Sequence, residues 1–507
     1  NNVVNKSSTK SSLISAKRVV SWEELNSKNT VDECWIGYRG KVYDVTRWLA
    51  KHPGGLRSIM STAGKDATSV MISLHAPETL AKHMKRIRQV GILPKERLTA
   101  ASSSTECTEQ ALVELKQQQM EDDFAQLHDF FDREGWYERI MWPYAFVFMR
   151  IALLWTLGLY GMKRGAESDN YGWTCLGSAC LGFFFQNVAF VGHDIGHGSV
   201  TMCIAVDSWL GLVIGNLWTG IDMTWWKSTH YVHHSATNAL DDDPDIQHSP
   251  IFCFDPGFEA GRFSTYHGRF LPQCIAFLVK RQHLYFHIVM AFARFNLYIQ
   301  SILHLIQTCP FRTTTTNATN TTTSTTVTDT LTGETRTKYA WHKPPAHHWL
   351  ASVISLTGFY AFYINFFLSL NNLPHTALAL LLSHAVAGIL HVQILLSHVA
   401  MDYCNSGPGH SQNVGYYQWQ ALSTMDIACH PIMDWFHGGL QFQLEHHMFP
   451  RLPRWRLRKA IPHVDEIFHK YNIVQPVRIP FLTANLQVLS HLKRVGEQVA
   501  SCLNKQT

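Results

Sequence analysis

The stretch WFHGGLQFQLEHHMFPRLPR, residues 435–454, contains the pattern that decides the fold of most of this chain. Within it, Gln443, His446 and His447 are spaced i, i+3 and i+4, which places their side chains on one face of a helix. Neutral imidazole is a common metal ligand and suits iron as well as zinc. The stretch therefore predicts a helix that presents nitrogen ligands to a metal.

Two earlier stretches repeat this pattern. HDIGH begins at residue 193, and HYVHH begins at residue 230 after a pair of tryptophans. Three such helix faces turned toward one point would surround metal with many neutral nitrogen ligands. A purely structural role or a structural zinc site is the alternative, but zinc needs only four ligands and this chain offers about twice that number. The candidate ligands in these two stretches are His193, His197, His230, His233 and His234.

Length and composition limit the class of protein. The chain has 507 residues, enough for more than one domain, and 46% of them are hydrophobic. A formal charge of +5 is too small to indicate nucleic-acid binding, and it suits an anionic membrane surface equally well. The 11 cysteines include no CxxC pair, so we expect free thiols. The polar beginning NNVVNKSSTKSS predicts no cleavable signal peptide.

Apolar segments predict a membrane domain with about four transmembrane helices in two hairpins. Each segment has about 20 residues, the length of a helix that crosses the hydrocarbon core. Two further segments carry polar residues and are predicted to be re-entrant or interfacial. The predicted crossings are residues 141–161, 172–192, 349–370 and 375–399, and the other two segments are 203–219 and 282–308.

Four crossings would place the three histidine stretches, both termini and a Thr-rich loop at 313–338 on one side of the membrane. Basic residues after His447 favour the cytosol for that side under the positive-inside rule. The glycosylation sequons at Asn317 and Asn320 would then remain unmodified. The basic residues are Arg451, Arg454, Arg456, Arg458 and Lys459.

A different pattern marks the N-terminal part. The run CWIGYRGKVYDVTRWLAKHPGG contains His52 before a Pro-Gly-Gly turn, and AGKDATSVMISLHAP supplies His75. Two histidines from opposite walls can hold haem iron on both axial sides, and such a haem has no open position and transfers electrons. The sequence predicts a small α+β haem-binding domain.

These motifs resemble two known families. The segment around His52 and His75 resembles the cytochrome b5 domain, and residues 130–475 resemble the membrane fatty-acyl desaturases. Gln443 at the start of the third stretch is typical of the front-end branch, which carries a fused cytochrome b5 domain. The resemblance implies a di-iron centre and adds one ligand, His398, after the fourth crossing. Asp194 and Glu445 would either orient the ligand rings or be solvated or helix-capping carboxylates.

The resemblance implies a function and its cofactors. Electrons from NADH or NADPH would pass through a flavin-containing cytochrome b5 reductase to haem b and then to two non-haem iron ions. With dioxygen, the iron centre would introduce a double bond near the polar end of a long acyl or sphingoid chain. The motifs AFARFNLYIQS, DPDIQHSPIF and WFHGGLQFQLEHH favour a sphingolipid Δ8-type enzyme of the endoplasmic reticulum membrane. Fatty-acyl Δ5, Δ6 or Δ8 desaturation, hydroxylation on the same scaffold, and a non-catalytic membrane haem protein are the alternatives.

The predicted fold is mixed, with a small α+β haem domain followed by an all-α membrane domain and a cytosolic helical cap. Residues 17–92 contain 13 Lys and Arg against 7 Asp and Glu, whereas cytochrome b5 domains commonly show an acidic face to their reductase. Seven further histidines are expected to serve packing: His248, His283, His287, His304, His384, His391 and His437. The predicted divisions are a disordered 1–16, a haem domain at 17–95, a linker and surface helix at 96–129, the membrane domain at 130–475 and a tail at 476–507.

Overall fold

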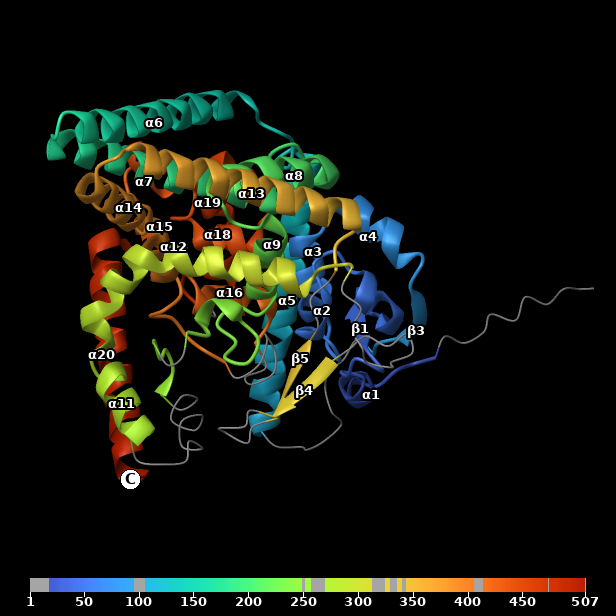
Figure 1. Ribbon diagram of the computed structural model, residues 1–507. Coiled ribbons are helices and arrows are strands. Elements are labelled where there is room, and N and C mark those ends of the chain that lie inside the picture. The colour runs from blue at the N-terminus through green and yellow to red at the C-terminus, as the bar shows by residue number, and fades with distance from the viewer. Residues whose placement is uncertain are drawn as a thin grey trace, which may run out of the picture.

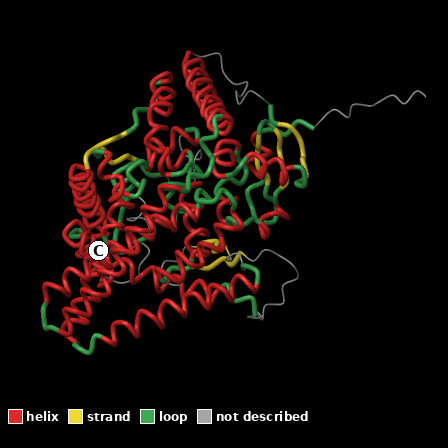
Figure 2. The backbone as a smooth tube through the Cα atoms, turned by 90° about the horizontal axis from the view of Figure 1, so that it is seen from above, coloured by secondary structure: helices red, strands yellow, loops and turns green. Residues whose placement is uncertain are grey.

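The structure is a computed structural model with a small N-terminal domain beside a larger helical body. The N-terminal domain lies at the right in Figures 1 and 2, and the C-terminal helix lies at the left in both views. The predicted disordered segment 1–16 and both sequons lie outside the described residues. The structure describes residues 18–94, 105–248, 251–256, 270–311, 324–328, 335–339, 343–404, 414–472 and 474–506.

The N-terminal domain is built on a three-stranded antiparallel sheet in the order β1-β2-β3. Ile36 pairs with Tyr43 across the first two strands, and both side chains are buried against short helices. The haem-domain signature therefore forms the α+β fold that its sequence predicts. The elements are α1 (Trp22–Ser27), β1 (Trp35–Tyr38), β2 (Lys41–Asp44), η1 (Thr46–Lys51), α2 (Leu56–Met60), α3 (Thr68–Leu74), α4 (Pro77–Met84) and β3 (Arg88–Ile92).

Two long hairpins form the apolar part of the body. In the first, α6 and α7 approach closely because small residues face each other: a Cβ atom on Gly161 would lie 2.9 Å from the Cα of Gly177. The second hairpin packs against the first through α7 and α14. The hairpin helices are α6 (Trp142–Glu167), α7 (Tyr171–Gly196), α13 (Ala346–Ser369), α14 (Leu373–Ala387) and α15 (Ile389–Leu396).

Large apolar side chains cover the outer faces of these helices. On α6 and α13, for example, Met149 is 61% exposed and Ile354 is 70% exposed. Exposed apolar surface on this scale is what lipid-facing helices require. Five helices of the described chain are long and apolar enough to cross a membrane, and one of them is α12 (Gln282–Gln307), which the sequence predicted to be interfacial.

The positions of His193 and His398 bear on whether α12 crosses. His193 lies near the end of α7 and His398 follows α15, and they belong to two adjoining groups of histidines that His234 and His447 connect. The two helices therefore end on the same side of a membrane, and α13 must begin on that side. If α12 crossed the membrane once between α7 and α13, α13 would begin on the opposite side. Four crossings, with α12 on the site's side, therefore fit the geometry best.

Much of the rest of the body consists of helices, most of them short, and one strand, and several of these elements surround the clustered histidines. Figure 1 shows α9, α16 and α18 in the centre of the body, with α5 between them and the N-terminal domain. These elements are α5 (Thr105–Arg133), α8 (Ile204–Gly211), η2 (Leu212–Leu217), α9 (Met223–Ser235), η3 (Pro244–Ile246), α11 (Phe270–Val279), α16 (Tyr416–Ser423), β6 (Met425–Ala428), η4 (Pro431–Met433), α17 (Asp434–His437), α18 (Gln443–Met448) and α19 (Arg454–Tyr471).

Two segments differ from the sequence prediction. The segment 476–507 is not a tail: β7 (Val477–Pro480) pairs in parallel with β6, and α20 (Phe481–Gln506) buries Val488, Leu492 and Val495. Its apolar residues at i, i+4 and i+7 form a helix face that needs a partner, and α20 finds α11 and α12. The Thr-rich loop at 313–338 contains a ribbon of β4 (Ser324–Thr328) and β5 (Thr335–Tyr339), because β-branched threonine favours extended backbone.

The arrangement of crossings predicts the glycosylation pattern in a eukaryotic host. The sequons at Asn317 and Asn320 should remain unmodified, because four crossings would leave α12 and the start of α13 on the site's side. A reporter loop with an acceptor sequon, inserted after Asn371 between α13 and α14, should be glycosylated. Endoglycosidase treatment followed by gel mobility measures both, and a mobility shift of the natural chain would show that α12 crosses.

Candidate metal centre

Two helices bring five histidines to one point. His193 and His197 lie one turn apart at the end of α7, and α9 carries the other three. Asp222 fixes the start of α9, because its carboxylate accepts the backbone N–H groups of Thr224 and Trp225. The ring Nδ1 of His304 lies 2.7 Å from the same carboxylate, so this histidine positions α9 from outside the metal centre.

In the first cluster, the ring nitrogens of several histidines lie close together. The Nε2 atom of His230 lies 3.0 Å from that of His197 and 3.1 Å from that of His234. The Nε2 atom of His446 lies 3.1 Å from that of His234. Nitrogen atoms of His193, His197, His230 and His446 lie within 4.8 Å of one another. We call these four residues and His234 the first cluster.

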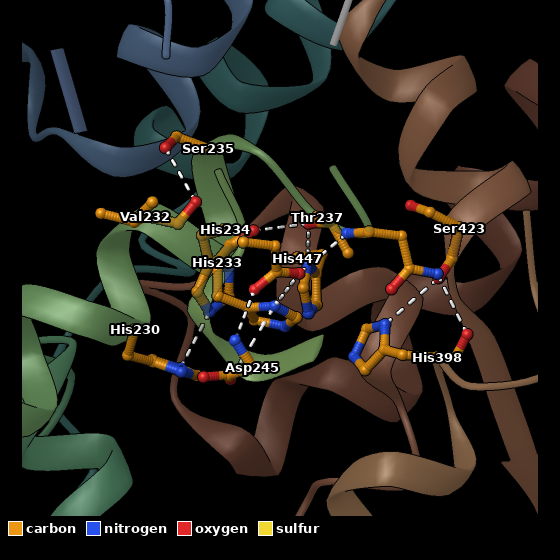
Figure 3. A network of polar contacts seen from close by, with 12 residues as sticks. His230, Val232, His233, His234, Ser235, Thr237, Asp245, His398, Ser423 and His447 are labelled. Atoms are coloured by element: carbon orange, nitrogen blue, oxygen red, sulfur yellow. Dashed lines mark hydrogen bonds and ion pairs between the residues drawn. The ribbon is translucent and has the colours of Figure 1, made fainter. Parts of the chain in front are cut away.

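The second cluster consists of His233, His398 and His447. Their ring centres form a nearly equilateral triangle with sides of 4.8, 4.9 and 4.9 Å, and all three side chains are buried. His234 stacks on His447 with ring centres 4.3 Å apart, which joins the two clusters. Figure 3 shows His233, His234, His398 and His447 gathered between helices that are distant in the sequence.

Outer hydrogen bonds leave one nitrogen of each second-cluster ring for a metal. The Nδ1 atom of His233 lies 2.9 Å from Asp243, that of His398 lies 3.2 Å from the carbonyl of Ser423, and that of His447 lies 3.0 Å from the amide oxygen of Gln420. The Nε2 atom of His398 is buried without a hydrogen-bond partner among the described residues. This arrangement is typical of metal-bound histidine, whose second nitrogen is fixed by an acceptor.

The protonation preferences of the rings also fit metal binding. Burial lowers the pKa of the imidazoles on α9 and α18 well below the usual value, which keeps them neutral: His230, His234, His446 and His447. His233 differs, since burial lowers its pKa but Asp243 and Asp245 raise it further, to about 9. These carboxylates would add negative charge next to a bound cation. The residues present therefore fit two metal ions, one at each cluster.

Asp194 and Glu445 do not orient the rings, contrary to one of the two roles expected from the sequence. Asp194 accepts hydrogen bonds from Tyr144 and Arg454, and so joins the end of α7 to α6 and α19. The carboxylate of Glu445 binds Arg478 at 2.8 Å. Buried carboxylates take the strongest cation within reach, and a guanidinium offers more than a neutral imidazole.

Arg478 holds α18 in place from the C-terminal segment. It binds Asp426 at 3.1 Å and Asp465 at 2.7 Å in addition to Glu445, which is fully buried. Asp426 also accepts the backbone N–H of Leu444. One guanidinium thus connects β7, β6, α19 and the helix that carries His446 and His447.

Gln443 lies in the first turn of α18 and is 4% exposed. Its helical spacing places it on the same face as His446 and His447, and its role toward a metal stays a prediction. The chain reaches α18 through Gly438, whose φ of +62° and contact with Phe190 exclude a larger residue. A cavity beside this turn is lined by His193, His197 and His446 together with Gly438 and Gly439.

The N-terminal domain brings His52 and His75 face to face. Their ring centres lie 5.9 Å apart, and each Nδ1 lies 3.1 Å from a backbone carbonyl, that of Gly55 or Met71. Two rings held opposite each other in this way fit the two axial positions of a haem iron. Burial lowers the pKa of His75, so its ring is neutral as an axial ligand must be. The φ of Gly55 is +83°, which explains the glycine in the HPGG turn.

Sequence reasoning did not find the ring partners of the second cluster. Asp243 could have been found, because the run DDDPD begins seven residues after His234 and supplies the carboxylates for His233. Gln420 and Ser423 have no such signal, since they lie far along the chain and only folding brings α16 beside α9. The seven histidines expected to serve packing lie outside both clusters.

Comparison with known proteins agrees with this geometry. Residues 171–478 match the model of the fatty acid desaturase family, and residues 21–93 match the cytochrome b5-like heme/steroid binding domain. The chain belongs to the fatty acid desaturase family. It carries a fused cytochrome b5-like domain, it is an oxidoreductase that acts on lipids, and its families imply haem and iron.

Named relatives match this desaturase over nearly its full length. A Delta(8)-fatty-acid desaturase of Borago officinalis is 32% identical over 95% of both chains. A Delta 8-(E)-sphingolipid desaturase of Komagataella phaffii is 28% identical over 95% of this chain and 94% of its own. Among solved structures, the cytochrome b5 of Ostreococcus tauri virus 2 is 38% identical, covers 15% of this chain and 96% of its own, and has a TM-score of 0.14.

Replacing Asp243 tests the outer partner of His233. Asp243→Asn removes the negative charge at the ring Nδ1, and we expect metal affinity to fall by about 10- to 100-fold. Iron content per haem, measured after dialysis against a graded chelator series, should fall while haem content stays unchanged. Asp241→Asn is the matched control in the same acidic run, because Asp241 is exposed. Equal iron retention in both variants would contradict the role of Asp243.

Replacing Arg478 tests the ion-pair network behind α18. Arg478→Leu leaves Glu445 as a buried carboxylate without its cation, and the loss of one partner of a buried pair costs about 3 kcal/mol. We expect lower thermal stability in detergent and loss of iron, because His446 and His447 shift with α18. Arg458→Leu is the control, since Arg458 pairs with the 41% exposed side chain of Asp434 and should change stability by less than about 1 kcal/mol.

Proposed function

We propose that this protein is a front-end desaturase that introduces the Δ8 double bond into the sphingoid long-chain base of a membrane sphingolipid. The family, the fused cytochrome b5-like domain and relatives named for Δ8 desaturation support the reaction class. The sphingolipid as substrate rests on the motifs around DPDIQHSPIF and QFQLEHH and on the name of the Komagataella relative.

One observation carries the proposal. Six buried and two partly buried imidazoles form two adjoining clusters at the ends of apolar helices, while two more lie opposite each other in the attached domain. A C–H bond of an unactivated methylene group is too strong for acid–base chemistry by a side chain, so bound iron and dioxygen must supply the oxidation. The same chain thus contains sites for an oxidising centre and for its electron donor.

The side chains of this protein then have separate tasks. The first cluster and the second cluster would each hold one iron ion, with Gln443 beside them, and His52 and His75 would hold haem b. The outer partners Asp243, Gln420 and Ser423 keep the ligand rings in one tautomer and orientation. Burial excludes bulk water from the centre, which protects the oxidation from side reactions.

Electron supply and membrane orientation complete the proposal. Electrons from NADH or NADPH would reach the haem through a flavin-containing cytochrome b5 reductase. We place the protein in the endoplasmic reticulum membrane with both termini and both clusters on the cytosolic side, where that reductase and nicotinamide are available. The basic balance of the haem domain favours a reductase with an acidic docking face.

A fatty-acyl desaturase is the second candidate. An Acyl-lipid (9-3)-desaturase of Borago officinalis is 28% identical over 90% of this chain. A relative of this name with similar coverage means that substrate class can differ within this level of identity, and fold alone does not determine it. Hydroxylation uses the same kind of centre and would give a product with one added oxygen atom.

Expression in a yeast host that lacks Δ8 sphingoid bases and polyunsaturated fatty acids tests the function. We expect mass spectrometry of the hydrolysed lipids to show sphingoid bases lighter by two hydrogen atoms, with the double bond at C8. A new double bond only in fatty acids would support the second candidate, and a hydroxylated base would support hydroxylation. Unchanged lipids in a membrane fraction that contains the haem protein would refute the desaturase.

His52→Ala separates the two parts of the chain. The variant should lose the haem absorption band and NADH-dependent product formation while keeping the non-haem iron. Lys51→Ala, at the exposed neighbouring position, is the control and should keep the haem. Full turnover of His52→Ala without added cytochrome b5 would contradict electron delivery through this domain.

A further inference from the structure

The N-terminal domain forms hydrogen bonds directly with the backbone of the segment that carries the metal ligands. The hydroxyl of Ser73, two residues before His75, donates to the carbonyl of Met448 at 2.9 Å and lies 3.3 Å from the carbonyl of His447. Ser73 is 1% exposed, so water does not compete for this contact. The contact therefore joins a haem-ligand segment to a second-cluster ligand through one side chain.

Tyr416 extends this contact to the other cluster. Its hydroxyl lies 3.3 Å from that of Ser73, and it lies 3.1 Å from the carbonyl of His447 and 3.4 Å from the carbonyl of His234. The ring is 5% exposed and packs among the buried residues of α5 and α18. Nothing in the haem fold itself requires a hydroxyl at Ser73, since both of its carbonyl partners belong to the other domain.

We propose that Ser73 and Tyr416 form the electron-transfer bridge from the haem domain to the metal centre, which rests on the proposed function. Electronic coupling passes better through covalent bonds and short hydrogen bonds than across gaps. The covalent segment from His75 to Ser73 and the hydrogen bonds to the ligand-bearing backbone supply such a path. Both residues are positioning residues, because they touch neither the substrate nor the reacting carbon atoms.

The bridge is used twice in each reaction. The balanced reaction is R–CH2–CH2–R′ + O2 + 2 e⁻ + 2 H⁺ → R–CH=CH–R′ + 2 H2O. A haem held by His52 and His75 would supply these electrons one at a time, and the proposed reductase would reduce it again after each transfer. A slower bridge should therefore lower kcat without changing KM for the lipid.

The contact of Ser69 with α5 at this interface offers a control. Ser69 lies one turn before Ser73 on α3, and its hydroxyl binds the carboxylate of Glu121 on α5. Glu121 also accepts the backbone N–H of Tyr417, which is not a metal ligand. Ser69 thus attaches the same helix to the same body without contacting a ligand-bearing backbone.

The test follows haem oxidation in the full-length protein loaded with haem and iron. The haem is reduced under argon and mixed with oxygenated phosphatidylcholine vesicles that contain dihydroceramide, while absorbance records ferrous haem. We expect Ser73→Ala and Tyr416→Phe each to slow haem oxidation several-fold and to lower kcat by the same factor. The haem spectrum, the haem midpoint potential, the iron content and the double-bond position should stay those of the natural chain. Ser69→Ala should oxidise at the natural rate.

Three results would contradict either the bridge or the proposed function. Natural rates in both Ser73→Ala and Tyr416→Phe overturn the bridge. An equal slowing in Ser69→Ala also overturns it, since docking alone would then explain the effect. If the natural protein shows no haem oxidation beyond that of the iron-depleted protein and forms no double bond, the proposed function fails rather than the bridge.

Discussion

Eight imidazoles, most of them buried and some with ring nitrogens about 3 Å apart, are the constraint on which the rest of the structure depends. Ring nitrogens that converge at this spacing suit a metal cation between them, because neutral imidazole is a common metal ligand. The side chains must therefore be held rigidly from behind, and the surrounding fold provides this support. Asp243 and Gln420 fix ring nitrogens, and Asp222 with His304 fixes the helix α9.

Ion pairs at the margin of the centre join segments that the sequence separates widely. Asp194 and Arg454 connect the end of α7 to α19, and Arg478 connects the C-terminal strand to α18. Buried pairs of this kind are weak evidence for overall stability but define one geometry, because a displaced partner leaves an uncompensated charge. Because Arg478 must stay paired with the buried Glu445, the C-terminal segment that carries Arg478 packs as part of the fold.

The helices around the metal centre present different faces to lipid and to the protein interior. Apolar side chains cover the outside of α6 and α13, whereas α12 turns Arg294, Ser301 and His304 inward and isoleucines outward. Arg294 is almost fully buried and satisfies its guanidinium with Tyr298, a backbone carbonyl and the ring of Phe185. Apolar composition alone therefore identifies helices that contact lipid, but the shared end point of α7 and α15 indicates how many of them cross.

The sequence by itself determined the two-part fold, and it predicted the histidines of the three stretches and the pair His52 and His75 as ligands. It could do so because helical spacing and the HPGG turn are local properties, encoded within a few residues. Only the tertiary structure decided the partners: Asp243 and Gln420 behind the rings, arginines rather than rings for Asp194 and Glu445, and Ser73 against the backbone of His447. These contacts join residues up to 374 positions apart, and no periodicity along the chain records which distant groups will meet.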